Sequence, residues 1–129
     1  MTQTCPEITL RVPGDQAYAL VIRTMLGGVA LLKDLDMDAM DDLRTAADEA
    51  VDCLLHQGAA VREMALSVRD EGKSLTVSLE ADMDEPTDPV DSDIAMTRAV
   101  LETLIPQVCL TSTEAGRIRR IDLTLAKAV

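Results

Sequence analysis

Hydrophobic and polar residues alternate along this chain with two periods, and each period predicts one kind of element. A period of two, typical of half-buried strands, is found in residues 8–12, 64–68 and 75–79, and residues 108–110 and 118–125 are also predicted to be strands. A period of three to four, typical of amphipathic helices, is found in residues 15–33, 38–56 and 94–104. Consecutive strand pairs with helices grouped between them predict an α+β fold. We expect a two-layer sandwich, in which about three helices cover one face of a mixed, mostly antiparallel sheet.

Turn-forming residues separate these segments. Pro13-Gly14 ends the first strand, Gln57-Gly58 ends the central helix, and Pro106 closes the last helix. Residues 82–93 are acidic and contain two prolines, so we expect a mobile loop there, long enough to suggest function. With 129 residues, the chain is long enough for one core and too short for two, so we expect a single domain over residues 1–129.

The central helix carries two distinct stripes. One is apolar and must pack on a sheet or another helix; its members are Met40, Leu43, Ala47, Ala50 and Leu54. The other places Glu49 between the small residues Ala46 and Cys53, at steps of three and four. Small residues beside one carboxylate are consistent with the wall of a site. The alternative is that Glu49 is a surface carboxylate of an acidic helix and Cys53 a small buried hydrophobic residue.

The first helix contains the pair Gly27-Gly28. Each glycine costs about 1 kcal/mol in a helix interior, so the pair calls for an explanation. Close packing of another helix is the plain interpretation. A phosphate-binding loop is not expected, because the pair lies within a helical pattern and no strand directly precedes it.

Composition and charge exclude several classes of partner. The formal net charge of -11 disfavours nucleic acid and anionic membrane surfaces, since phosphate binding relies on Lys and Arg. No apolar run approaches the roughly 20 residues that a membrane span needs, and the first residues do not resemble a signal peptide. Three widely spaced cysteines and one histidine predict neither a disulfide framework nor a metal site. We therefore expect a cytoplasmic protein with a protein or small-molecule partner.

The order of elements and the run at residues 42–50, DLRTAADEA, resemble the anti-sigma-factor serine kinases of the GHKL ATPase superfamily. In that family a similar helix carries the motif E-A-x-x-N, which Glu49-Ala50 and Cys53 match in position. The resemblance covers nearly the whole chain and implies the GHKL fold, ATP and Mg²⁺ as cofactors, and a sigma factor or anti-sigma antagonist as partner. It also implies homodimerisation.

The resemblance assigns roles residue by residue. Glu49 matches the general base that accepts the proton of a substrate serine. Cys53 stands where the family has the asparagine that ligates Mg²⁺, and a thiol is a poor ligand for that ion. The aspartate that binds adenine has its positional counterpart near residues 81–84, where Asp82 lies without the usual glycines.

The last family motif, a G-x-G turn before the final helix, aligns with Ala95-Met96-Thr97. Side chains replace both glycines, which hinders backbone approach to a phosphate. A separate basic cluster, formed by Arg117, Arg119 and Arg120, is interpreted either as a solvated strand face or as a contact for an acidic partner.

Two functional hypotheses follow. The first is an anti-sigma-factor-like regulator of a bacterial partner-switching system, with a degenerate ATP site and weak or absent nucleotide binding. The alternative is an active ATP-dependent protein serine kinase that phosphorylates an anti-sigma antagonist. The cysteine at position 53 and the side chains at 95–97 favour the first hypothesis, whereas the retained Glu49 favours the second.

Overall fold

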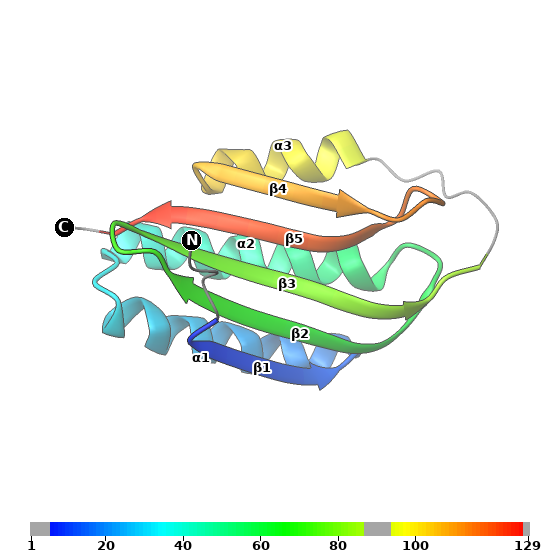
Figure 1. The fold of residues 1–129 in the computed structure, drawn as a ribbon, viewed down its shortest axis with the longest axis horizontal. Helices are drawn as coiled ribbons and strands as arrows, with labels where there is room; N and C mark the ends of the chain where they lie inside the picture. The colour runs from blue at the N-terminus through cyan, green and yellow to red at the C-terminus, as the bar shows by residue number, and fades with distance from the viewer. Residues whose placement is uncertain (1–5, 87–93, 128–129) are drawn as a thin grey trace, which may run out of the picture.

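The computed structural model describes residues 6–86 and 94–127, which form one sheet and a layer of helices (Figure 1). The elements in chain order are β1 (Ile8–Pro13), the 3₁₀ turn η1 (Gln16–Tyr18), α1 (Ala19–Leu32), α2 (Met37–Leu55), β2 (Ala60–Asp70), β3 (Ser74–Asp84), α3 (Ile94–Leu104), β4 (Gln107–Ser112) and β5 (Ile118–Ala126). All the predicted strands and helices are present. The predicted α+β class is confirmed.

The strands are arranged in the order β1-β2-β3-β5-β4. Every pairing among the described strands is antiparallel, so the sheet is not mixed. The register aligns the alternating apolar residues of neighbouring strands on one face, where Leu66 lies opposite Leu79 and Leu79 opposite Ile121. This shared face forms the floor of the core.

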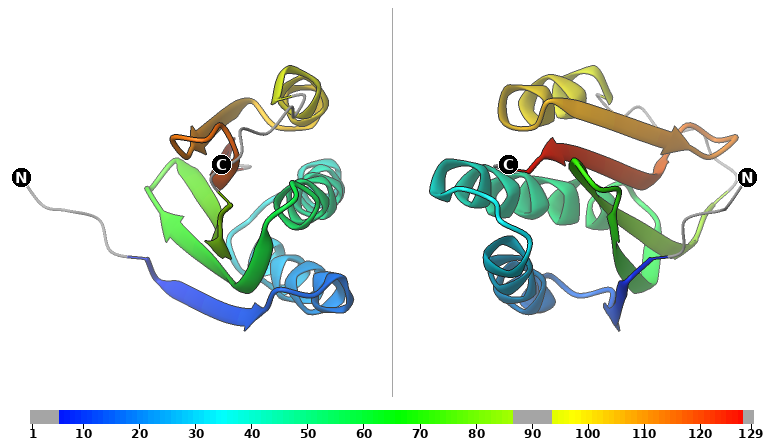
Figure 2. Two further views of the ribbon diagram at one scale, coloured as in Figure 1. Left: turned by 90° about the vertical axis from the view of Figure 1, so that its right-hand side faces the viewer. Right: turned by 60° about the vertical axis from the view of Figure 1, so that its left-hand side comes forward.

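The helices lie on one face of the sheet and leave the other face open, as both views in Figure 2 show. α1 lies beside β1, α3 lies beside β4, and α2 crosses the middle of the sheet. The predicted apolar stripe of α2 faces the core, where Leu43 and Leu54 have no exposed surface. Burying one such leucine contributes about 1.5–3 kcal/mol, so this stripe anchors the helix layer to the sheet.

Short polar residues set the starts of the helices. The Asp15 side chain accepts a hydrogen bond from the Ala17 N–H at 2.9 Å and so caps η1, which leads into α1. Asp36 caps α2 by accepting from the Ala39 N–H at 2.8 Å. Gly58 follows α2 with φ +76°, a conformation that suits glycine, as predicted for the helix end.

Two expectations from the sequence need correction. β3 extends to Asp84, so the acidic segment is a strand at its start; residues 87–93 of the expected loop lie outside the described part. A methyl group added at Gly27 or Gly28 would meet no atom within 4 Å beyond its own helix. The glycine pair therefore does not serve close packing of another described helix.

None of the helices within residues 6–86 and 94–127 combines the length and the apolar character that crossing a membrane requires.

Candidate functional site

Three of the predicted site residues meet between α2 and α3. Glu49 and Cys53 lie one turn apart on α2, and both are half-buried. The Thr97 hydroxyl, in the first turn of α3, donates to the Cys53 Sγ at 3.8 Å. The structure thus joins the position that matches the family's asparagine to the segment that matches its G-x-G turn, although 44 residues separate them in sequence.

The environment of Cys53 keeps its thiol protonated. Burial raises the pKa of Cys53 above its ordinary value, and the Thr97 hydrogen bond opposes this shift. The nearby carboxylates of Glu49 and Asp52 raise the pKa further, because they disfavour a second negative charge. At neutral pH Cys53 is therefore a small neutral side chain and not a thiolate nucleophile.

Magnesium does not fit this arrangement. Mg²⁺ prefers hard oxygen ligands, whereas Cys53 supplies a neutral sulfur that already accepts a hydrogen bond. Residues 6–86 and 94–127 contain no group of three or more His, Cys, Asp or Glu side chains placed to hold a metal ion.

Glu49 differs from most acidic residues of the molecule in that it makes no hydrogen bond or ion pair with another described residue. Its neighbour Asp48 pairs with Arg23 of α1 at 3.3 Å, and Asp52 pairs with His56 at 3.1 Å. His56 also lies 2.8 Å from the Asp52 carbonyl at the end of α2, in agreement with its predicted helix-end position. Of the three carboxylates closest to Cys53 along the helix, Asp48, Glu49 and Asp52, Glu49 is accordingly the one that remains available to a ligand.

The first turn of α3 presents side chains where the family motif has glycines. α3 begins at Ile94, so Ala95, Met96 and Thr97 lie in its first turn. The first turn of a helix attracts anions in general. Here Ala95 and Met96 are exposed and Thr97 is engaged with Cys53, which restricts close approach of a phosphate to the backbone.

Asp82 lies elsewhere. Along β3, Ala81 faces the helices with 3% exposure, so the next side chain points to the open face of the sheet. Asp82 pairs there with Arg62 at 2.7 Å and lines a pocket of about 250 Å³ beside Arg11 and Glu80. The strand alternation thus places Asp82 on the face of the sheet that the helices leave open, and its expected role at adenine stays a prediction.

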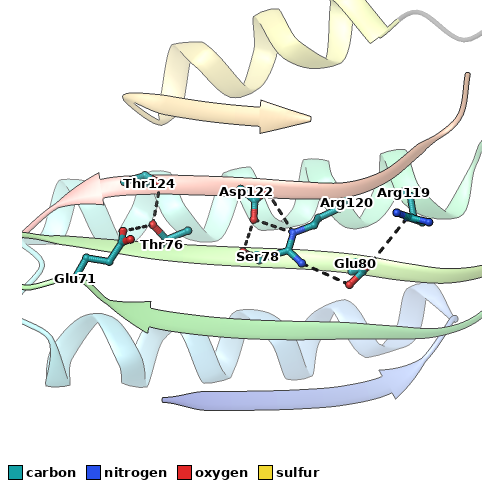
Figure 3. A network of polar contacts seen from close by, with 8 residues as sticks. All are labelled: Glu71, Thr76, Ser78, Glu80, Arg119, Arg120, Asp122 and Thr124. Atoms are coloured by element: carbon teal, nitrogen blue, oxygen red, sulfur yellow. Dashed lines mark hydrogen bonds and ion pairs between the residues drawn. The ribbon is translucent and has the colours of Figure 1, made fainter. Parts of the chain in front are cut away.

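The open face carries two groups of polar contacts along β3 and β5 (Figure 3). Ser78, only 2% exposed, donates to Asp122, and the Arg120 Nη2 donates to the Ser78 hydroxyl at 3.2 Å. Arg120 also reaches Glu80 at 3.6 Å. These contacts compensate the charges within the face, which explains how polar side chains become buried without a covering helix.

The predicted basic cluster is divided by the fold. Arg119 and Arg120 pair with Glu80 on the open face, whereas Arg117 is buried at 4% exposure. The Arg117 Nε donates to the Gln57 carbonyl at 2.8 Å, and its Nη1 lies 3.4 Å from Glu85. Arg117 therefore joins the ends of α2 and β3 to the start of β5, and it is not available as a surface contact.

Gln57 is a second residue of this junction that the sequence did not single out. Its side-chain amide donates to the Ile118 carbonyl at 2.8 Å and accepts from the Ile118 N–H at 2.6 Å, as a neighbouring strand would. The signal in the sequence is weak, because a glutamine before Gly58 reads as an ordinary helix end.

Comparison with known proteins supports the fold. No family model matches the chain, and no curated protein matches it. A solved structure, the crystal structure of the RsbU and RsbW domains of Rv1364c from Mycobacterium tuberculosis, matches with a TM-score of 0.65 over 97% of this chain. The chain shares the fold of the matched part of that structure. The fold expected from the resemblance is confirmed. The two sequences are 18% identical, and the chain spans 35% of the matched chain.

Proposed function

We propose that this protein is an anti-sigma-factor-like regulator of a bacterial partner-switching system that acts by binding a protein, with weak or absent nucleotide binding. The observation that carries the proposal is the contact between Cys53 and Thr97. A neutral thiol stands where the kinases that this chain resembles have a magnesium ligand. The Thr97 hydroxyl is already engaged in a hydrogen bond to that thiol.

Two further placements support weak nucleotide binding. The exposed Met96 side chain stands at the start of α3, where a phosphate would need an open backbone. Asp82, the residue expected at adenine, faces the other side of the sheet and pairs with Arg62. We propose a sigma factor or an anti-sigma antagonist as the partner, a cytoplasmic location, and a homodimer as the assembly.

The test is isothermal titration calorimetry with ATP and ADP, with and without Mg²⁺. We expect no heat of binding from the wild-type protein at micromolar nucleotide. The informative variant is Cys53→Asn, which restores an oxygen ligand; Cys109→Asn, at an exposed cysteine of β4, is the matched control. Micromolar binding by the wild type would overturn the proposal. Binding by Cys53→Asn alone would support it and identify the missing ligand.

The second candidate function, an ATP-dependent protein serine kinase, is favoured by one observation. Glu49 remains half-buried and without an ion pair among the described residues, as a general base requires. Transfer of labelled phosphate from ATP to a serine of a candidate antagonist, abolished by Glu49→Gln, would establish this function. Absence of transfer by wild type and by Cys53→Asn would exclude it for that antagonist.

A further inference from the structure

The outward side of α1 is an uncharged surface on a strongly acidic protein. We call it the α1 face and define it by residues that recur at steps of three and four, which are Leu20, Val21, Thr24, Gly28 and Leu31. Leu20 is 65% exposed and Leu31 72% exposed. The helix has one charged residue, Arg23, and it is turned to Asp48 of α2. Large contiguous apolar patches are rare on monomeric proteins and mark interaction sites.

The α1 face borders a groove. The groove has a volume of about 470 Å³ and lies between α1 and the edge strand β1, where Leu10 meets Leu20, Val21, Thr24 and Met25. Its lining is almost entirely apolar, with Thr24 as the exception, and the Thr24 hydroxyl is already bonded to the Leu20 carbonyl at 2.8 Å. The groove therefore offers no free polar group to a ligand and is suited to large aliphatic or aromatic side chains.

The glycine pair adds room above this surface. Gly27 and Gly28 weaken α1 as a helix, and nothing in the described part of the chain uses the space they leave. Small residues on a helix surface permit the backbone of a second helix to come close. A helix laid along the α1 face would fill the space over Gly28 and insert side chains into the groove.

The segments directly before and after α1 carry acidic residues, which we call the acidic rim. Asp34, Asp38 and Asp41 follow Leu32 in the turn and the first turns of α2, and Asp15 precedes α1. The first three are exposed and make no ion pair with a described residue. A partner with Lys or Arg beside its apolar residues complements this rim, whereas a second α1 face would bring aspartates against aspartates.

We propose that the α1 face binds an amphipathic helix of a partner protein, with large apolar residues along one side and basic residues flanking them. This is the helix-in-groove mode of recognition, in which the apolar stripe of the helix supplies the buried area. The acidic rim selects the charge of the partner and disfavours an anionic lipid surface. The proposal does not depend on whether the protein binds nucleotide.

The probe is a fluorescein-labelled peptide of about 18 residues, five helical turns, that places leucines on one side and lysines on the other. Binding is measured by fluorescence anisotropy, beside a peptide of the same composition scrambled so that no apolar stripe forms. We expect saturable one-to-one binding of the patterned peptide and much weaker binding of the scrambled one. Equal binding of the two peptides would overturn the proposal, because charge alone would then explain it.

Two variants test the surface without relying on loss of fold. Leu20→Gln removes an exposed anchor, and Gly28→Gln fills the space over the helix while improving its helix propensity. Each variant should lower the affinity for the patterned peptide by roughly tenfold or more, as expected for a central contact. Gly28→Gln should also raise the Tm of the protein. Thr45→Gln, at an exposed position of α2, is the matched control and should bind as the wild type does.

Further measurements test the acidic rim and two other possible occupants of the α1 face, a lipid surface and a second copy of the protein. The double variant Asp38→Asn and Asp41→Asn should lower the affinity for the patterned peptide. The matched control, Glu102→Gln with Glu114→Gln, removes the same number of negative charges far from α1 and should lower that affinity less. Unchanged affinity in the Leu20 and Gly28 variants would refute the proposal. Two other results would also refute the proposal if Leu20→Gln abolished them. One is sedimentation of the protein with phosphatidylglycerol vesicles in place of peptide binding, and the other is concentration-dependent self-association of the protein.

Discussion

Replacing the glycines of α1 by alanine should stabilise the protein. Neither Gly27 nor Gly28 has a positive φ, and an added methyl group meets no atom within 4 Å at either position. The substitution therefore brings the helix propensity of alanine without strain. Alanine is favoured over glycine by about 0.8–1.0 kcal/mol in a helix interior.

The expected size follows from the length of the chain. For 129 residues, an unfolding entropy of about 2.1 cal/mol/K per residue converts 1 kcal/mol into a Tm change of about 4 °C. Gly28→Ala should thus raise the free energy of unfolding by about 1 kcal/mol and the Tm by about 3–4 °C. The double variant should approach twice these values, because neither added methyl group meets an atom within 4 Å.

The assay is urea denaturation and thermal melting followed by circular dichroism at 222 nm. Three glycines provide matched controls. Gly72→Ala and Gly58→Ala should destabilise the protein because their φ values are +93° and +76°. Gly14→Ala should do so more strongly, since a Cβ there would lie 2.1 Å from the Val61 carbonyl oxygen. An unchanged or lower stability of Gly28→Ala would refute the reasoning, because it would mean that α1 packs closely against something over this position.

Three further predictions concern charges and thiols. The pKa of Asp70 is held well below its usual value by hydrogen bonds from Lys127 first, and then from the Gly72 N–H and Lys33. Because the pKa of Asp70 is lower in the folded than in the unfolded state, its stabilisation is present above about pH 4 and is lost as the pH falls. Asp70→Asn should therefore lower the Tm at pH 7, and its difference from wild type should shrink in melts at lower pH; a constant difference would contradict this. Arg117→Met should cost about 2–4 kcal/mol in urea denaturation, because it removes the cation that pairs with Glu85 and the donor to the Gln57 carbonyl; a change below 1 kcal/mol would show that the junction is not stabilising. Iodoacetamide at pH 8 should alkylate exposed Cys109 well before Cys53, whose pKa burial raises; peptide mass spectrometry would reveal the reverse order if Cys53 were a reactive thiol.

The elements were predictable because their signals are local. The stripe through Leu43, Ala47 and Leu54 fixed the buried side of α2, and Pro106 limited α3, which spans Ile94–Leu104 as expected. These signals depend on residues within one or two turns of each other, and no long-range contact overrides them.

The site was only partly predictable, because its geometry depends on strand register. Arg119 and Arg120 separate from Arg117 at an irregularity of β5, where the register shifts between Thr111 and Ser112 of the paired strand β4. The spacing of three between the core residues Ile118 and Ile121 is the trace of that bulge in the sequence.

Asp82 shows the same limit. Its face depends on how far β3 continues, and the acidic composition of the segment suggested a loop although the strand extends to Asp84. By contrast, the Cys53–Thr97 contact was foreseeable only through the resemblance, which aligned two motifs that no local pattern connects.

The measurement that tests the central claim most directly is the Tm of the wild-type protein in about 1 mM MgATP. A ligand with a dissociation constant of about 10 μM would add about 2.7 kcal/mol at that concentration, which corresponds to a rise of about 10 °C for this chain length. Weak or absent nucleotide binding predicts a change below about 1 °C in the wild type and a larger one in Cys53→Asn. A rise near 10 °C in the wild type would contradict the account and favour a functional kinase site around Glu49.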